Sequence, residues 1–167
     1  MAIKTSYQQK IDFYLDSLDE LGESLIDQSG SSGLSRSILR IILGTMMTSK
    51  GAIISIEKKK LDVLAIQGKS TTKKPLNINE NQKKFLSQFK NSHLIKKNID
   101  AFPIAEKDNY LIELINTLDT RILVPLYHRK ELTGLVAVGQ KFTKQHFSKD
   151  DKKVLEIVCN HLDYKFR

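Results

Sequence analysis

The sequence contains a single cysteine, Cys159, and this scarcity excludes several classes of protein. One cysteine can form neither an intrachain disulfide nor a zinc cluster of several thiolates, so a reducing, cytoplasmic setting is expected. The sequence also lacks an apolar run of the roughly 20 residues that a helix needs to cross a bilayer. Its N-terminus lacks a signal-peptide pattern. These absences predict an intracellular protein without a membrane span.

Catalytic motifs are missing as well. The sequence has no GxSxG nucleophile turn, no GxxxxGK[ST] phosphate loop and no GxGxxG dinucleotide turn. Four histidines fall in different predicted elements without HExxH or close-pair spacing: His93, His128, His146 and His161. We therefore expect no enzyme activity and no metal site.

Positive charge is in excess, with 27 Lys plus Arg against 19 Asp plus Glu and a net charge of +8. Such a surface attracts nucleic acid, acidic lipid or anionic metabolites. The lysines form scattered groups in predicted turns and on exposed helix faces, at 58–60, 73–74, 83–84 and 96–97. Because aromatic residues do not alternate with them, nucleic-acid binding is not favoured, and a solvated surface is the simpler interpretation.

Apolar periodicity predicts the N-terminal elements. Between residues 7 and 26, apolar residues recur at gaps of three and four, as on one helix face: Ile11, Tyr14, Leu18, Leu21 and Leu25. The same residues fit a short heptad pattern, so a dimer seam and a helix packed on its own core remain equal alternatives. Residues 28–33 resemble a flexible hinge, and residues 35–49 a core helix.

Two predicted hairpins flank an irregular helical insert. Residues 51–57 and 61–67 form the first hairpin and residues 121–127 and 131–140 the second, while two short helices lie between them. A final helix follows Ser148, a plausible N-cap, and reaches residue 162. This order predicts an α+β fold with a central antiparallel sheet flanked by helices on both faces.

At this point the chain resembles a GAF domain. The resemblance rests on the segments 42–56, 123–127 (LVPLY) and 132–139 (LTGLVAVG), and on FSKDD at 147–151. It implies an N-terminal amphipathic helix and hinge at 1–30, followed by a GAF sensory domain at 31–167. GAF domains bind small molecules, cyclic nucleotides and tetrapyrroles among them, between the sheet and the helical insert. They usually regulate a neighbouring output domain.

Cyclic-nucleotide-binding relatives carry an Asn-Lys, Phe, Asp-Glu signature after the last long strand. Lys141, Phe147 and Asp151 match it, whereas Gln140 replaces the Asn and Lys152 the Glu. A Lys141–Asp151 ion pair would tie the strand end to the helix start, and Phe147 would plug the gap beneath it. We expect this structural latch, as an exposed pair, to contribute at most about 1 kcal/mol.

Candidate ligand contacts lie on the predicted hairpins and insert. A cyclic nucleotide needs an apolar slot for its base and N–H groups for its phosphate, as at the insert helix expected to begin at residues 108–110. Most of these residues have a structural explanation as well, since Ser55 can bond back to the chain and the aromatics can belong to the core. The candidate contacts are Ser55, Gln67, Phe102, Asn109, Tyr110, Arg121, Val124 and Thr133.

Three functions remain as hypotheses. The first is a regulatory domain that binds a cyclic nucleotide, cAMP before cGMP, forms a homodimer through its terminal helices and controls a C-terminal output domain such as a diguanylate cyclase. The second is a ligand-free dimerisation or interaction module with a basic surface. The third is reduction of oxidised methionine, an activity of some compact relatives. Cys159 lacks the second cysteine that this chemistry uses, and it is not where a bilin would be attached.

Overall fold

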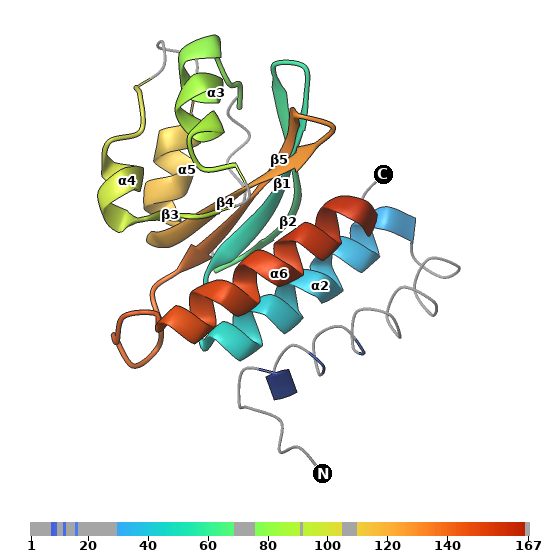
Figure 1. The fold of residues 1–167 in the computed structure, drawn as a ribbon, viewed down its shortest axis with the longest axis vertical. Coiled ribbons are helices and arrows are strands. Elements are labelled where there is room, and N and C mark those ends of the chain that lie inside the picture. The colour runs from blue at the N-terminus through green and yellow to red at the C-terminus, as the bar shows by residue number, and fades with distance from the viewer. Residues whose placement is uncertain are drawn as a thin grey trace.

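The protein is an α+β fold built on a five-stranded antiparallel sheet of order β2-β1-β5-β4-β3 (Figure 1). The structure, a computed structural model, describes residues 8, 9, 12, 16, 30–68, 76–90, 92–104 and 110–165. The strands are β1 Gly51–Glu57, β2 Lys60–Gln67, β3 Leu94–Ile95, β4 Thr120–His128 and β5 Glu131–Gly139. The helices are α2 Gly30–Met46, α3 Glu80–Ser87, α4 Lys96–Asp100, α5 Leu111–Thr117 and α6 Lys149–Lys165. The predicted fold class is confirmed.

Both predicted hairpins are present, and β1 and β5 join them in the middle of the sheet. Register partners are Ile53 with Ala65 in the first hairpin, Val124 with Val136 in the second, and Ile53 with Val136 between them. The residues LVAV of β5 are the β-branched and apolar types that suit a strand buried between two layers, and the similar VLAI of the edge strand β2 is partly buried.

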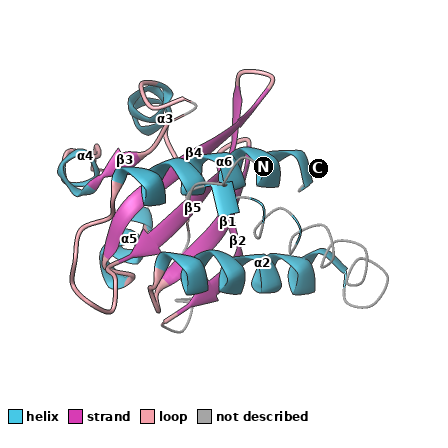
Figure 2. Ribbon diagram, turned by 60° about the horizontal axis from the view of Figure 1, so that its bottom comes forward, coloured by secondary structure: helices cyan, strands magenta, loops and turns pink. Residues whose placement is uncertain are grey.

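Each face of the sheet carries a separate apolar cluster. Helices α2 and α6 cover one face, here called the helix face, and α3, α4 and α5 cover the other, the insert face (Figure 2). On the helix face, Ile42 and Val158 pack with Val124 and Val136. On the insert face, Leu86 and Leu114 pack with Leu123 and Leu135. Burying each such side chain contributes roughly 1.5–3 kcal/mol.

The edges of the sheet are unequal. Strand β3 consists of two residues only. At the other edge, Leu61 N donates to Leu76 O over 3.1 Å and Ile78 N to Lys59 O over 3.0 Å, so residues 76–78 occupy the hairpin end of β2. Edge strands that are short or covered present few unpaired backbone groups.

The structure differs from the sequence predictions in three places. Helix α2 begins at Gly30, so residues 30–33 of the predicted hinge are helical, because the packing of the apolar stripe that follows outweighs a glycine cost of roughly 1 kcal/mol each. Strand β3 and helix α4 were not predicted, because pieces this short leave no periodicity. Helix α5 begins at Leu111 rather than at 108. The five apolar residues of the predicted stripe between 11 and 25 lie outside the described residues, whereas residues 8, 9, 12 and 16 are helical. The domain boundary at residue 30 stays a prediction.

Gly139 stands where three backbone segments meet, and a side chain has no room there. An added Cβ would lie 2.7 Å from Leu118 O and 2.9 Å from Lys50 O, and neither carbonyl belongs to a flexible side chain. We predict that Gly139→Ala lowers the free energy of unfolding by about 2–3 kcal/mol, measured by urea denaturation.

Gly44 provides the matched control for this substitution. It lies in α2, where an added Cβ meets nothing within 4 Å. Gly44→Ala should raise stability by about 0.5–1 kcal/mol, because alanine loses less conformational freedom in a helix. Equal effects of the two substitutions would contradict the close approach at Gly139.

Candidate functional site

A cleft of about 380 Å³ opens at the β3 edge of the sheet, beside the start of α6. We call it the basic cleft. Four parts of the fold supply its walls: β3 with the first turn of α4, the start of β4, the loop after β5 and the first turn of α6. Its lining residues are Ile95, Lys96, Lys97, Arg121, Ile122, Gln140, Lys144, Gln145, His146, Phe147 and Lys152.

Among the described residues, the lining of the basic cleft contains cationic side chains and no carboxylate. Two of the cations are paired with acids outside the lining, Lys96 with Asp100 and Arg121 with Asp119, each over 3.0 Å. Lys97, Lys144 and Lys152 have no ion pair among the described residues. The positive potential of the cleft is therefore only partly compensated.

The basic cleft also has an apolar part. Ile122 and Phe147 belong to the helix-face cluster and line the cleft from inside, and the half-exposed Ile95 pairs in register with Ile122. Arg121 lies next to them, and its Nε is buried without a hydrogen-bond partner in the described residues. An apolar floor under a cationic rim is the arrangement that suits a small organic anion.

The Lys141–Asp151 pair is adjacent in the chain to Gln140 and Lys152, which line the basic cleft. Lys141 Nζ is 2.6 Å from Asp151 Oδ2, and the two side chains are only 12% and 6% exposed. The Lys141 ammonium also lies 5.3 Å from the ring centroid of Phe147. The sequence indicated an exposed pair, whereas the structure buries it, so removing one partner costs more than the loss of a surface ion pair.

Asp151 also caps helix α6. Ser148 Oγ accepts from Asp151 N over 3.1 Å, and Ser148 N donates to Asp151 Oδ2 over 3.0 Å, so the predicted N-cap is present. Burial alone would raise the pKa of Asp151, but the hydrogen bonds from Lys141 and Ser148 and the charge of Lys141 outweigh it and hold that pKa below its ordinary value. The carboxylate is thus ionised and engaged at neutral pH.

A second contact ties α6 to the insert. His93, just before β3, contacts the Glu156 carboxylate through Nδ1. Glu156 lies two helical turns beyond Ser148 on α6. The insert side and the β5 side of the basic cleft are therefore both bonded to the same helix.

The predicted contacts on the hairpins are spread over the sheet. Ser55 Oγ donates to Asp62 O over 3.5 Å, and Thr133 Oγ1 donates to Leu126 O over 3.2 Å, so both hydroxyls bond back to a neighbouring strand. Val124 is buried on the helix face, and Gln67 ends β2 opposite Gly51. Among the described residues that were predicted to contact a ligand, Arg121 alone lines the basic cleft.

The remaining predicted contacts belong to the insert. Phe102 is buried in the insert-face cluster, where its ring makes an edge contact with Phe85 at 5.6 Å between centroids. Tyr110 is the N-cap of α5, and Asn109 lies outside the described residues. The described residues between sheet and insert form an apolar packing of the following side chains: Ala52, Ile54, Ile56, Leu61, Ile78, Leu86, Leu94, Ile99, Phe102, Leu111, Leu114, Ile115, Leu118, Leu123, Leu135 and Ala137.

Sequence reasoning missed most of the basic cleft. Lys96 and Lys97 were interpreted as solvated surface, Lys144 drew no attention, and Lys152 was noted only as a departure from the signature. These residues are far apart in the chain, and only the position of α6 against the β3 edge brings them together. The available signals were Arg121, a charge at the start of an apolar strand, and the partial signature, which includes Gln140, Phe147 and Lys152.

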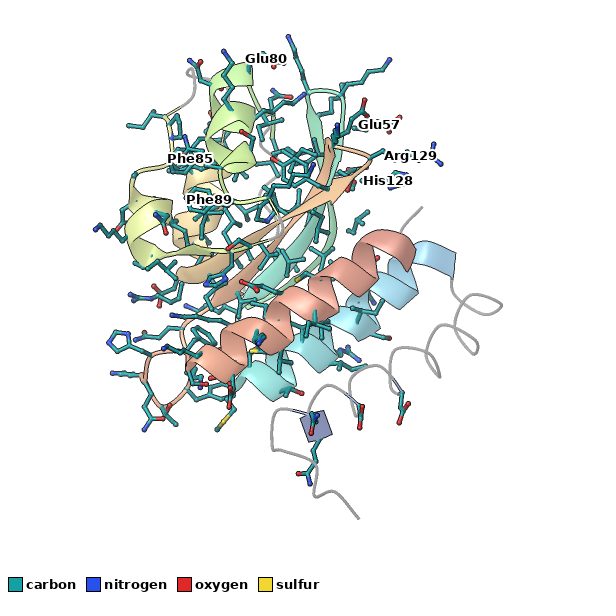
Figure 3. All side chains as sticks on the ribbon, viewed as in Figure 1. Glu57, Glu80, Phe85, Phe89, His128 and Arg129 are labelled. Atoms are coloured by element: carbon teal, nitrogen blue, oxygen red, sulfur yellow. The ribbon has the colours of Figure 1, made fainter. Side chains whose placement is uncertain are left out.

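A second basic hollow lies at the opposite end of the sheet. It measures about 480 Å³ and is lined by Lys58, Lys83, Lys84, Ser87, Tyr127, Lys130, Glu131 and Leu132. Figure 3 shows Glu57, His128 and Arg129 at the neighbouring hairpin tips and Glu80 on α3 nearby. We call this region the hairpin-tip surface. Burial raises the pKa of the Tyr127 phenol, and Lys90 Nζ lies 5.9 Å from its ring centroid.

Catalytic and metal chemistry have little support in the described part of the chain. Cys159 is fully buried, and burial together with the charge of Glu156 raises the pKa of its thiol, which disfavours the reactive thiolate. The described residues contain no group of three or more His, Cys, Asp or Glu placed to hold a metal ion. None of the described helices has the length and apolar character needed to span a membrane.

We predict that Asp151→Asn destabilises the protein by about 2–3 kcal/mol at pH 7, because it leaves the buried Lys141 ammonium without its counter-charge. The folded-state pKa of Asp151 is lowered, so its contribution is present above the unfolded pKa of about 3.9 and is lost as pH falls through the folded value. The gap between wild type and variant should therefore narrow below about pH 4. Urea denaturation of wild type and variant at several pH values measures this difference in the free energy of unfolding.

Asp150 is the matched control for that experiment, because it is the preceding residue in the same helical turn and is exposed. Asp150→Asn should change stability by no more than about 0.5 kcal/mol. An equal loss in both variants would show that the helix dipole, rather than the Lys141 contact, makes Asp151 important.

No family model matches the sequence, and no curated protein matches it. Solved structures match the fold. The GAF domain of a phosphoenolpyruvate-protein phosphotransferase from Coxiella burnetii has a TM-score of 0.66 at 12% identity, over 96% of this chain and 94% of that one. The phycoerythrobilin-bound GAF domain of a cyanobacterial phytochrome has a TM-score of 0.56 at 9% identity, over 98% and 95%.

A free methionine-R-sulfoxide reductase from Neisseria meningitidis, solved with its substrate, has a TM-score of 0.59 at 15% identity, over 99% of this chain and 95% of that one. One of these proteins holds phycoerythrobilin and another its substrate. Because each similarity spans nearly the whole of both chains, the protein has the GAF fold.

Proposed function

We propose that this chain is a non-catalytic regulatory domain that binds a small anionic ligand and transmits binding through helix α6. The observation that carries the proposal is the basic cleft, which combines an apolar floor with unpaired lysines and includes the first turn of α6 in its wall. A ligand there would contact the sheet edge and the helix at the same time.

Helix α6 is a suitable element to transmit the signal. Lys141 holds its first turn to the end of β5, and His93 holds its middle to the insert. A ligand that binds more tightly to one position of α6 relative to these contacts shifts the population of molecules toward that position. Because α6 shares the helix-face cluster with α2, a shift of α6 would also reach α2.

A cyclic nucleotide is the first ligand to consider, with cAMP before cGMP. The partial match to the signature at Lys141, Phe147 and Asp151 supports this choice, as does the presence of Phe147 in the lining of the basic cleft. The output would be a C-terminal domain such as a diguanylate cyclase. Proteins of this fold with a bound bilin and with a sulfoxide substrate illustrate that the fold accepts chemically different small molecules.

A ligand-free interaction module is the alternative, and the hairpin-tip surface favours it. Lys58, Lys84 and Lys130 line one hollow there, with Glu131 as the acid in the lining. Such a surface suits an acidic protein segment. This alternative gains support if small ligands do not bind while the chain still associates with an acidic partner in a salt-dependent way.

We predict that isothermal titration of the purified chain with cAMP, cGMP and cyclic dinucleotides shows saturable binding of one of them. The same ligand should raise the melting temperature, because a ligand concentration of 100 Kd stabilises the folded state by about 2.7 kcal/mol. Hydrogen exchange should report added protection in the loop 140–148 and the start of α6. Binding without any change at α6 would contradict the proposed transmission.

We also predict a homodimer through the terminal helices, since a two-fold pair lets one binding event alter the spacing of two attached outputs. Size-exclusion chromatography with light scattering should give twice the mass of one chain. A strict monomer at high concentration would remove this part of the proposal.

A further inference from the structure

We infer that the basic cleft selects a phosphate-bearing ligand with more negative charge than a cyclic mononucleotide carries. This inference rests on the proposed function and names the ligand class of the same site. It follows from three features of the cleft: the balance of charge in its lining, the location of its apolar surface, and its separation from the space between sheet and insert.

The lining of the basic cleft carries positive charge that no carboxylate of the described residues balances. After Lys96 and Arg121 are assigned to Asp100 and Asp119, the cleft retains Lys97, Lys144 and Lys152 without a carboxylate partner in the described residues. A phosphodiester such as that of cAMP supplies a single negative charge, whereas a phosphate monoester carries about 1.5–2 charges at pH 7. Complementary charge matters more in a partly enclosed cleft than on open surface, because salt screens it less.

The cations come from three separate elements that surround one space. Lys97 is on α4, Lys144 is in the loop after β5, and Lys152 is on α6. The amides of Gln140 and Gln145 line the same space and can donate to phosphate oxygens. A ligand with phosphates at two positions would therefore bridge the insert side and the α6 side.

The apolar floor indicates that the ligand is not phosphate alone. Ile122 is fully buried, Phe147 is nearly so, and the exposed Ile95 lies beside Ile122. Ile95 keeps 38% of its surface exposed, so an apolar or aromatic ring placed on it would bury surface that inorganic polyphosphate leaves wet. The inferred ligand class is thus a nucleotide or similar ring compound with a terminal phosphate monoester or a pyrophosphate.

The location of the cleft separates this site from the insert face. The described residues between sheet and insert are apolar side chains in mutual contact, whereas Ile122 and Phe147 belong to the cluster on the opposite face. A ligand in the basic cleft would touch α6 directly and would leave the insert-face packing intact.

The test is a titration series that changes charge on one scaffold: cAMP, AMP, ADP and ATP, with inorganic tripolyphosphate as the ring-free probe. We expect affinity to rise from cAMP to ADP by at least about tenfold, and to fall with added salt. Tripolyphosphate should bind more weakly than ADP, because it cannot use the apolar floor. Equal affinity for cAMP and ADP, or tighter binding of tripolyphosphate than of ADP, would overturn the inference.

Two charge-matched double variants locate the binding. Lys97→Glu with Lys144→Glu removes cations of the basic cleft, and Lys58→Glu with Lys84→Glu makes the same charge change at the hairpin-tip surface. All four side chains are exposed, so both variants should fold, and thermal unfolding without ligand checks this. We expect ADP affinity to fall at least about tenfold in the cleft variant and to stay within about twofold in the other.

The outcomes separate this inference from the proposed function. Equal losses in both variants indicate a general charge effect and overturn the cleft as the site, as does the absence of saturable binding by every member of the series. If cAMP binds and neither variant weakens it, the regulatory function stands with its site elsewhere, and the inference fails alone.

Discussion

The burial of both faces of the sheet is the constraint on which the rest of this structure depends. Strands β1, β4 and β5 pack against α2 and α6 on one side and against the insert on the other, so almost every residue in their centres is apolar. Charged side chains are therefore concentrated at the ends and edges of the sheet. The basic cleft at the β3 edge and the hairpin-tip surface are two such places.

The contacts of α6 connect this architecture with the proposed regulation. The buried Lys141–Asp151 pair and the Ser148 cap place the first turn of the helix, and the His93–Glu156 contact places its middle. A buried pair is costly to break, so these contacts favour a helix that moves as a unit over one that frays. A ligand bound at the first turn would then displace the helix as a rigid body rather than only its first turn.

Local patterns predicted the fold well because they depend on neighbours in the chain. The hairpins follow from β-rich runs separated by a few residues, and the α6 boundary follows from Ser148 and Asp151 at capping distance. The two-residue β3 and the five-residue α4 left no such pattern, and they form one wall of the basic cleft. Lys97 and Lys152 line the same cleft through tertiary packing alone. The sequence could therefore indicate an excess of positive charge, but not that these two lysines lie in one cleft. Arg121 was predicted as a ligand contact and lines the cleft, whereas the hydroxyls of Ser55 and Thr133 bond back to the backbone.

The unequal edges of the sheet limit how this protein can associate with others. Strand β3 offers two residues to an incoming strand, and residues 76–78 already occupy the hairpin end of β2. In the described part of the chain, backbone-mediated strand addition, the route to open-ended fibres, therefore has access to β3 and to the part of β2 near Gln67. A charge introduced at Ile66 or Gln67 would hinder strand addition along that part of β2, and assembly through side chains on helices and loops would be unaffected.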